Sequence, residues 1–377
     1  MTVIQITDIH YDPEYKEFSN TECYEPMCCR SDHGIPKDNK TAAGYWGDYR
    51  KCDLPWRTLL NALDQIKKHH KHIDLIYMTG DIVAHSIWET TIEKNTYAIK
   101  KVLRKIKEVF PNVPVFPILG NHEPSPLNVY TPPDVDDSIS TRWLYELVAD
   151  EWSVWLPPET RETILQGGYY SVLVKPGFRI VGINSNLCYT LNWFIAIDDN
   201  TQFLLDHLNW LAQTLYEAEL AREKVHILSH VPINDMCLYE WGKEYKRIID
   251  RFQSTVIAQF VGHTHWDEFE LYYSLDDPTK PINVAFNGGS LTHYDNLNSN
   301  YKVYKVHPET YDIIDGETWI FNLTEANESP YENIKPHWFK LYSYKEAFNM
   351  ESLYPEDFDK LAYRMASDKA LLQKYAW

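Results

Sequence analysis

Apolar runs alternate with amphipathic stretches through about residue 230, and this pattern predicts strands alternating with helices. Five runs are short and mostly apolar, as is typical of buried strands: Val3–Thr7, Leu75–Thr79, Val113–Leu119, Val225–Leu228 and Thr255–Val261. Between them, apolar residues recur at helical spacing over residues 54–68, 92–109 and 202–216. Strands that alternate with such helices predict a sheet with helices on both faces.

Beyond about residue 256 the pattern changes to short strands, which we expect at Val284–Phe286, Tyr301–Val306 and Thr318–Leu323. The chain therefore predicts an α/β fold in which two sheets pack face to face as a sandwich flanked by helices. We expect a catalytic domain over residues 1–330. Residues 331–377 then form a C-terminal helical subdomain, in which Pro355 stands at a first helical position.

One short aromatic segment, Trp193-Phe194-Ile195, is open to two interpretations. It is either a buried strand, which we favour, or a loop that touches a membrane. No apolar run elsewhere approaches the roughly 20 residues that a membrane-spanning helix needs.

Polar segments follow all five predicted buried strands directly. They are Asp8-Ile9-His10, Gly80-Asp81, Gly120-Asn121-His122-Glu123, Ser229-His230 and Gly262-His263-Thr264-His265. In layered α/β proteins, functional groups gather just beyond the carboxyl ends of the strands. We therefore expect these side chains to meet in one site. Asp-x-His alone carries little information, whereas Gly-Asn-His-Glu and Gly-His-x-His are each moderately specific.

The residue types predict a site for two metal ions. The carboxylate of Asp81 has two oxygens and can bridge the ions. We assign Asp8, His10 and His265 to one metal and Asn121, His230 and His263 to the other. Such donors suit Zn²⁺, with Mn and Fe as alternatives. Two metals would activate a bridging hydroxide for in-line attack on a phosphoester.

The departing alkoxide also needs a proton, and two further histidines lie beside the predicted ligands. His122 follows Asn121 directly, and His85 lies four residues after Asp81. A free imidazole has a pKa near 6.5, so either residue is a candidate general acid in acidic solution. The sequence does not choose between them.

Charge and cysteine content limit the setting of the protein. The net charge is −18 over 377 residues, which argues against nucleic acid as an electrostatic partner. Six cysteines are compatible with disulfides, and Asn39, Asn322 and Asn327 begin glycosylation sequons. We therefore expect a lysosomal or secreted protein. Met1 leads directly into the first strand, so we expect any signal peptide to lie upstream of it.

The five motifs resemble those of the calcineurin-like metallophosphoesterases. Purple acid phosphatases in that group have a Tyr three residues after the bridging Asp and no His two residues after the first Asp. Ala84 and His10 occupy these positions, so this subgroup is excluded.

The chain resembles the acid sphingomyelinase family more closely, over nearly its whole length. The segments that carry this resemblance are Cys23–Arg30, Lys51–Pro55, Gly80–His85, Ala258–Glu270, Asn322–Asn327 and Tyr363–Met365. The family also has a saposin-like domain and a linker before the catalytic domain, and a cysteine-rich tail after it. We recognise none of these in the chain.

The resemblance implies hydrolysis of sphingomyelin to ceramide and phosphocholine at acidic pH by a di-zinc enzyme. It implies that His85 and His122 lie near the leaving group and that Tyr294 lies near the substrate. It also implies three disulfides: Cys23–Cys28, Cys29–Cys52 and Cys188–Cys237. We expect a monomer that contacts lipid surfaces transiently.

Two other functions remain open from the sequence. The first is a sphingomyelinase-like phosphodiesterase that acts on nucleotides or other soluble phosphodiesters, because such enzymes share the same metal motifs. The second is an interaction module on an inactive phosphoesterase fold. Inactive members usually lose ligands, and every predicted ligand is present in this chain.

Overall fold

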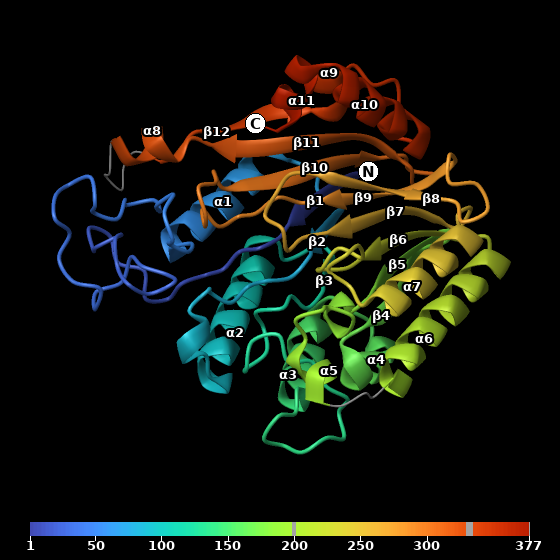
Figure 1. Ribbon diagram of the computed structural model, residues 1–377, viewed down its shortest axis with the longest axis horizontal. Coiled ribbons are helices and arrows are strands. Elements are labelled where there is room, and N and C mark those ends of the chain that lie inside the picture. Colours follow the sequence, from blue (N-terminus) through green and yellow to red (C-terminus); the bar gives the residue numbers. More distant parts are fainter. Residues whose placement is uncertain (198–200, 329–334, 377) are drawn as a thin grey trace.

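The computed structural model describes residues 1–197, 201–328 and 335–376, and within this part of the chain two six-stranded sheets pack against each other (Figure 1). The first sheet has the order β12-β11-β10-β1-β2-β3. Its strands are β1 (Thr2–Ile6), β2 (Leu75–Met78), β3 (Val115–Pro117), β10 (Asn300–Val306), β11 (Ile313–Phe321) and β12 (Trp338–Ser343). The β1, β2 and β3 strands run parallel, whereas β10, β11 and β12 are antiparallel additions.

The second sheet has the order β4-β5-β6-β7-β9-β8. Its strands are β4 (Tyr170–Lys175), β5 (Phe178–Gly182), β6 (Lys224–Leu228), β7 (Val256–Val261), β8 (Phe269–Tyr273) and β9 (Pro281–Asn287). The four central strands, β5, β6, β7 and β9, are parallel, and each edge strand is antiparallel to its neighbour. Both sheets are therefore mixed. In each sheet, the parallel strands have their carboxyl ends at the same edge.

Aromatic side chains join the facing sides of the two sheets. The ring of Phe260 on β7 lies 4.9 Å from Tyr77 on β2 and 4.9 Å from Tyr304 on β10. Phe286 on β9 also packs on Tyr304, at 5.5 Å between ring centroids. These side chains are fully buried or nearly so. This shared core fixes the parallel parts of the two sheets relative to each other, so their carboxyl ends meet.

Helices cover the outer sides of the sandwich. They are α1 (Trp56–His69), α2 (Ile92–Val109), α3 (Arg142–Glu151), α4 (Arg161–Gly167), α5 (Trp193–Ile197), α6 (Thr201–Leu220), α7 (Tyr239–Arg251), α8 (Leu323–Glu328), α9 (Tyr344–Phe348), α10 (Pro355–Ser367) and α11 (Lys369–Tyr375). Four short 3₁₀ helices are η1 (Ile87–Glu89), η2 (Trp152–Val154), η3 (Pro158–Thr160) and η4 (Ser185–Leu187). In Figure 1, α6 and α7 lie beside the second sheet and α9 to α11 lie over β11 and β12.

The two-sheet α/β architecture predicted from the sequence is confirmed. The helix expected over residues 92–109 is α2, which begins where the Thr91 hydroxyl accepts a hydrogen bond from the backbone N–H of Lys94. Pro355 is the first residue of α10, as expected. No helix in the described parts of the chain has the length and apolar character needed to cross a membrane.

Two local predictions differ from the structure. The segment Trp193–Ile195 is not a buried strand but lies in helix α5, where Trp193 is exposed and Phe194 is buried. Burial of one side only is typical of a short helix on the surface. A run of three residues is too short to distinguish such a helix from a strand by its hydrophobic pattern. The strand expected at Thr318–Leu323 is β11, which begins at Ile313 and ends at Phe321, while Leu323 begins α8.

The C-terminal segment contains a strand that the sequence did not reveal. β12 pairs with β11, and α10 packs against β8 and β9 of the other sheet. Buried residues of this segment, such as Trp338 and Phe358, belong to the same core as the two sheets. The predicted boundary at residue 330 lies in 329–334, outside the described residues. A separate helical subdomain therefore stays a prediction.

Candidate functional site

Loops that follow five parallel strands meet at one end of the sandwich. Asp8 and His10 follow β1, Asp81 follows β2 and Asn121 follows β3, all from the first sheet. From the second sheet, His230 follows β6, and His263 and His265 follow β7. The loops are bonded to one another; the backbone N–H of Ile9, for example, donates to the carbonyl of Asp81 at 2.7 Å. All seven predicted ligands are thus brought together.

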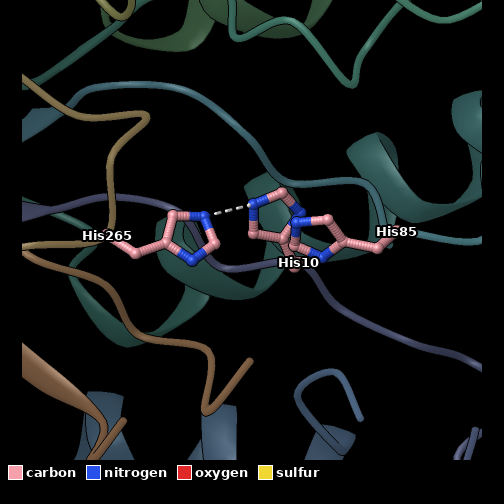
Figure 2. A group of neighbouring side chains, drawn as sticks. All are labelled: His10, His85 and His265. Atoms are coloured by element: carbon pink, nitrogen blue, oxygen red, sulfur yellow. Dashed lines mark hydrogen bonds between the residues drawn. The ribbon is translucent and has the colours of Figure 1, made fainter. Parts of the chain in front are cut away.

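The first group of donor atoms comes from Asp8, His10 and His265. His10 Nε2 lies 3.1 Å from His265 Nε2, and His265 Nε2 lies 3.4 Å from Asp8 Oδ1. Figure 2 shows His10 and His265 pointing toward each other. The site is buried: Asp8 and His10 have no exposed surface, and the side chain of His265 is 12% exposed.

The second group comes from Asn121, His230 and His263. Asn121 Oδ1 lies 3.0 Å from His230 Nε2 and 2.7 Å from His263 Nδ1. The carboxylate of Asp81 stands between the two groups, because its Oδ2 is 3.2 Å from His230 Nε2 and 3.4 Å from His10 Nε2. One carboxylate oxygen therefore faces both groups, which is the arrangement that a bridging ligand requires.

The backbone at the predicted ligands adopts an uncommon conformation. Positive φ angles occur at Asp8 (48°), His10 (41°), Asp81 (54°), His263 (75°) and His265 (63°). Residues other than glycine rarely have positive φ, and those that do are often found at functional sites. In an extended chain, consecutive side chains point to opposite faces. The sharp turns at these strand ends direct side chains that are close in sequence into one small volume.

Backbone carbonyls orient three of the histidine rings. The Nδ1 atoms of His10, His230 and His265 lie 2.7, 2.7 and 3.0 Å from the carbonyl oxygens of Val83, Thr79 and Tyr294. With Nδ1 donating to a carbonyl, the neutral ring has an unprotonated Nε2 that faces the site. This contact fixes both the tautomer and the direction of each ring.

The electrostatics of the site favour positive charge. Burial would lower the pKa of His10, but the hydrogen bond to Asp8 and the charge of Asp81 raise it to about 9. For His230, burial is likewise outweighed by Asp81, and the pKa rises to about 9. Despite burial, the neighbouring histidines hold the pKa of Asp8 and of Asp81 below the usual range. Cations are therefore stabilised at this position.

His85 lies at the edge of the donor groups and forms an ordered pair with a buried carboxylate. Its Nδ1 lies 2.8 Å from Asp53 Oδ1, and its backbone N–H donates to Asp53 Oδ2 at 2.6 Å. The imidazole is sandwiched between His10, at 3.8 Å between ring centroids, and Tyr294, at 4.2 Å. Figure 2 shows the His85 ring stacked on His10.

His122 also reaches the site but lacks such a partner. Its ring centroid lies 4.8 Å from His10 and 4.6 Å from His85. Its Nδ1 is buried and has no hydrogen-bond partner among the described residues. Burial holds the pKa of His122 well below its usual value, although the charge of Asp81 opposes this shift.

A cavity of about 520 Å³ opens onto the donor groups. Its lining includes Asp81, Asn121, His122, His263 and His265 together with His85 and Tyr294. Apolar and aromatic side chains complete the wall: Pro26, Ile87, Leu127, Tyr189, Trp266 and Leu297. A phosphate group near the donor atoms would therefore have an apolar, partly aromatic wall beside it.

Comparisons with known proteins agree with this geometry. The Calcineurin-like phosphoesterase family matches residues 1–267. The chain belongs to this family. A crystal structure of a dimetal phosphatase from Danio rerio covers 91% of this chain and 99% of its own, with a TM-score of 0.51 at 13% identity, which shows the shared fold.

Two kinds of phosphodiesterase are similar to this calcineurin-like phosphoesterase along its length. Sphingomyelin phosphodiesterase from Bos taurus is 39% identical over 99% of this chain and 59% of its own length. The human protein of that name is 38% identical over the same shares. Human cyclic GMP-AMP phosphodiesterase SMPDL3A is 31% identical over 98% of this chain and 81% of its own. The chain thus spans 59% of the length of the two sphingomyelin phosphodiesterases.

Membership of this family implies that the protein binds divalent metal ions, and the residues present are suitable ligands for such ions. His10 Nε2 and His265 Nε2 face each other at 3.1 Å while each Nδ1 lies against a carbonyl oxygen. At this distance the two ring nitrogens share either a proton or a metal cation, and the raised pKa of His10 shows that this position favours positive charge. The donor atoms of Asp81, His230 and His263 likewise all lie within 4.8 Å of one another.

Asp53, Glu123 and Asn128 support the phosphoesterase site, and we assigned no role to any of them from the sequence. Glu123 accepts hydrogen bonds from the backbone N–H groups of Ile82 and Gly120, beside Asp81 and Asn121. Asn128 Oδ1 accepts from Asn121 Nδ2 at 2.9 Å, which turns Asn121 Oδ1 toward the histidines. The position of Glu123 within the Gly-Asn-His-Glu motif was the one available signal.

Three disulfides join the pairs that the resemblance implied: Cys23–Cys28, Cys29–Cys52 and Cys188–Cys237. Of the predicted glycosylation sites, Asn39 is exposed and Asn322 is partly buried. The Asn327 side chain accepts from the backbone N–H of Trp46 and donates to the carbonyl of Gly47, so its amide is already engaged. Ser329 of that sequon lies outside the described residues.

Proposed function

We propose that this chain is a metal-dependent phosphodiesterase that hydrolyses sphingomyelin to ceramide and phosphocholine. The observation that carries the proposal is the position of Asp81 Oδ2, which faces His10 and His230 at 3.4 and 3.2 Å and so links two groups of donors. The similarity to sphingomyelin phosphodiesterases over 99% of the chain supports the lipid substrate.

Each group of donors would hold one divalent cation. Asp8, His10 and His265 would hold one ion, Asn121, His230 and His263 would hold the other, and Asp81 would serve both. We propose Zn²⁺ for both positions; Mn and Fe accept the same mixture of imidazole, carboxylate and amide donors. When bound, two such ions lower the pKa of water and offset the negative charge of the phosphoryl oxygens.

His85 is the residue that we assign as the general acid. Burial would raise the pKa of Asp53, but His85 and His10 lower it to about 2, so this carboxylate remains charged in acidic solution. The carboxylate fixes the Nδ1 side of His85, which leaves the Nε2 proton for transfer. Water adds its oxygen to phosphorus and releases one proton to the solvent, the bond from phosphorus to the ceramide oxygen breaks, and that oxygen receives the proton of His85.

His122 would then act on the phosphoryl group as a neutral side chain. Among the residues that the structure describes, it has no carboxylate partner comparable to Asp53, and burial holds its pKa well below the usual value. Its backbone N–H donates to Asp81 Oδ1 at 2.8 Å, so the same residue also fixes the bridging carboxylate. We therefore assign it to substrate positioning.

Tyr294 and the apolar wall suit the phosphocholine and ceramide portions of the substrate. The Tyr294 ring stacks on His85 with an interplanar angle of 14° and lines the cavity. Aromatic faces attract quaternary ammonium groups such as choline. A lysosomal or secreted location, transient contact with a lipid surface and a monomeric state are part of the same proposal.

The second candidate substrate is a nucleotide or another soluble phosphodiester. The 31% identity to human cyclic GMP-AMP phosphodiesterase SMPDL3A, over 81% of that protein, supports this alternative. The donor groups would serve both substrates equally, because only the phosphodiester contacts them.

A direct comparison of substrates tests the choice. Phosphocholine release from micellar sphingomyelin at pH 5 is measured beside hydrolysis of ATP and cyclic GMP-AMP by the same preparation, together with elemental analysis of bound metal. We expect turnover of sphingomyelin. Fast nucleotide hydrolysis without any release of phosphocholine would exclude the lipid assignment but not the metal site.

Variants of the bridge test the metal mechanism separately. Asp81→Ala and His230→Ala should both abolish hydrolysis of every substrate. Glu219→Gln is a matched control, because it also removes a carboxylate but from an exposed ion pair with Arg251. Full activity of the Asp81 variant would be incompatible with the proposal.

A further inference from the structure

The loop between β7 and β8 carries His263 and His265, and it is tied to the opposite sheet two residues after His265. The tie is the side chain of Asp267, whose carboxylate reaches the antiparallel part of the first sheet. Four donors from strands β10, β11 and β12 and the adjoining helix α9 converge on it. They are Lys302, Thr318, Tyr342 and Tyr344.

The contacts use both oxygens of Asp267. Lys302, which is fully buried on β10, donates to Oδ1. Thr318 on β11 and Tyr342 on β12 donate to Oδ2 at 2.5 and 2.7 Å. Lys302 also donates to the Thr318 hydroxyl at 2.7 Å, so the donors are linked to one another.

This network costs free energy unless every group in it is paired. A buried ammonium or carboxylate that loses its partner leaves an uncompensated charge, which is strongly destabilising. Satisfied by several hydrogen bonds, the same pair holds its geometry rigidly. The network therefore fixes the position of Asp267 relative to β10, β11 and β12.

The two histidines of the loop depend on different anchors. Asn287 of β9 holds the first half of the loop, because its Nδ2 donates to the carbonyl of Gly262 at 2.9 Å and to the Thr264 hydroxyl at 2.8 Å. The second half begins at His265, whose ring contacts the carbonyl of Tyr294 at 3.0 Å, and the backbone that follows His265 is held through Asp267. His263 belongs to the donor group with Asn121 and His230, whereas His265 belongs to the group with Asp8 and His10.

We propose that Asp267 is a positioning residue that selectively fixes His265, and with it the metal position formed by Asp8, His10 and His265. The inference rests on the proposed function, because it assumes that the two donor groups bind metal. It gives the C-terminal strand β12, through Tyr342, a part in forming the metal centre. The Asn121, His230 and His263 position depends on it much less.

The variant Asp267→Asn tests this inference through metal affinity. It preserves the size of the side chain but removes the charge that pairs with Lys302. Wild type and variant are equilibrated with Zn²⁺ against a graded competing chelator, and bound zinc is measured by elemental analysis. We expect one position to retain its affinity and the other to weaken between about 10- and 100-fold, the usual effect of losing a residue that orients a ligand.

Two further measurements separate positioning from a general loss of stability. In Asp267→Asn/Lys302→Met no unpaired ammonium remains, so thermal stability should recover while the weakened zinc position does not. Excess Zn²⁺ should restore hydrolysis by the single variant. Glu219→Gln, which loses an exposed carboxylate, should bind zinc as wild type does.

The outcomes distinguish this inference from the proposed function. Wild type that binds no zinc and hydrolyses no phosphodiester would contradict the proposed function itself. Wild type that binds two zinc ions, with an Asp267→Asn variant that binds both equally well, would overturn only the role of Asp267. Equal weakening of both positions in the stable double variant would also overturn it.

Discussion

At the scale of single residues, the candidate metal centre contains backbone conformations that residues other than glycine usually avoid. Asp8, His10, Asp81, His263 and His265 all have positive φ. Each such residue costs on the order of 1 kcal/mol or more, so the surrounding contacts must hold it in place. Gly80 and Gly262, which directly precede Asp81 and His263, allow the loops to approach one another closely. The centre is therefore sensitive to small additions of volume.

Gly120→Ala should disrupt the centre through one methyl group. A Cβ at position 120 would overlap Asp81 Oδ1 and the backbone nitrogen of Asp81, and it would lie 2.7 Å from Glu123 Oε2. We expect loss of bound metal and a fall in kcat/KM of at least about 100-fold, because a misplacement of about 1 Å has effects of that size. Metal analysis and kinetics check this.

Gly242→Ala is the matched control for this substitution. A Cβ at Gly242 would meet its neighbours only at 3.8 Å or beyond, which is an ordinary van der Waals distance. That variant should keep its metal and its activity. A Gly120→Ala protein with two bound metals and normal kinetics would show that the tight fit around Asp81 is not required.

Asp53→Asn should change the pH dependence of hydrolysis. Burial lowers the pKa of His85, and the charge of Asp53 opposes this shift. Without that charge the pKa of His85 falls further, so the protonated general acid is lost at lower pH. The alkaline limb of the kcat/KM profile should move to lower pH, and kcat should fall by about 10- to 100-fold.

The corresponding change at His122 provides the comparison for that profile. Under our assignment, His122→Gln lowers kcat without moving the alkaline limb. If the limb moves in the His122 variant and stays in place in Asp53→Asn, the proton donor is His122 and our assignment is wrong.

The sequence reveals the residues of the centre better than the residues that orient them. The clustering of Asp8, Asp81 and His230 was predictable because each follows a buried strand, and parallel strands end at one edge. Asp53 was not, since its contact with His85 spans 32 residues and depends on how the cysteine-containing insertion folds back. Positive φ angles at the ligands leave no pattern in the residue types.

At the scale of elements, strand and helix periodicity predicted most of the parallel framework. The runs at Leu75–Thr79 and Val225–Leu228 became β2 and β6 with small changes at their ends. The sequence did not reveal β12 because residues 338–343 alternate weakly and lie at the edge of a sheet, where the four residues between Trp338 and Ser343 are exposed or half-buried. Pairing with β11, a tertiary contact, decides its structure.

The insertion between β1 and α1 contains few regular elements, so disulfides hold it. Cys29 and Cys52 are fully buried, and Cys52 directly precedes Asp53. The variant Cys29→Ala/Cys52→Ala should lose about 2–4 kcal/mol of stability. Because Asp53 then loses its position, activity should fall as well. Thermal unfolding, limited proteolysis and kinetics measure these effects.

The disulfide Cys23–Cys28 is the control, since it closes a much shorter loop. The sequence separations are 5 for this pair and 23 for Cys29–Cys52. Loop-closure entropy predicts that losing the shorter bridge costs about 1 kcal/mol less. Activity should change little in Cys23→Ala/Cys28→Ala. Equal losses in both variants would show that loop length does not determine the effect.

At the scale of the whole molecule, buried histidines link stability to pH. Burial lowers the pKa of His226 and of His293 to about 4, and of His207 to about 3. Each of these residues binds a proton more readily in the unfolded chain, where the pKa is near 6.5. These three histidines therefore destabilise the folded state as pH falls below about 6.5. The proposed acidic location would place the protein inside this range.

His207→Phe should relieve part of that loss. His207 is 2% exposed on α6, packs on Tyr169 and Trp210, and has no hydrogen-bond partner for either ring nitrogen within the described residues. At pH 5 its protonation in the unfolded chain costs about 2 kcal/mol, and this cost vanishes above pH 7.5. The variant should therefore gain stability relative to wild type mainly at pH 5, as measured by urea unfolding at pH 5 and at pH 7.5.

The control is His72→Gln, which replaces an exposed histidine and should gain no stability at either pH. The same gain at pH 5 and pH 7.5 would show that improved packing, and not proton linkage, is responsible.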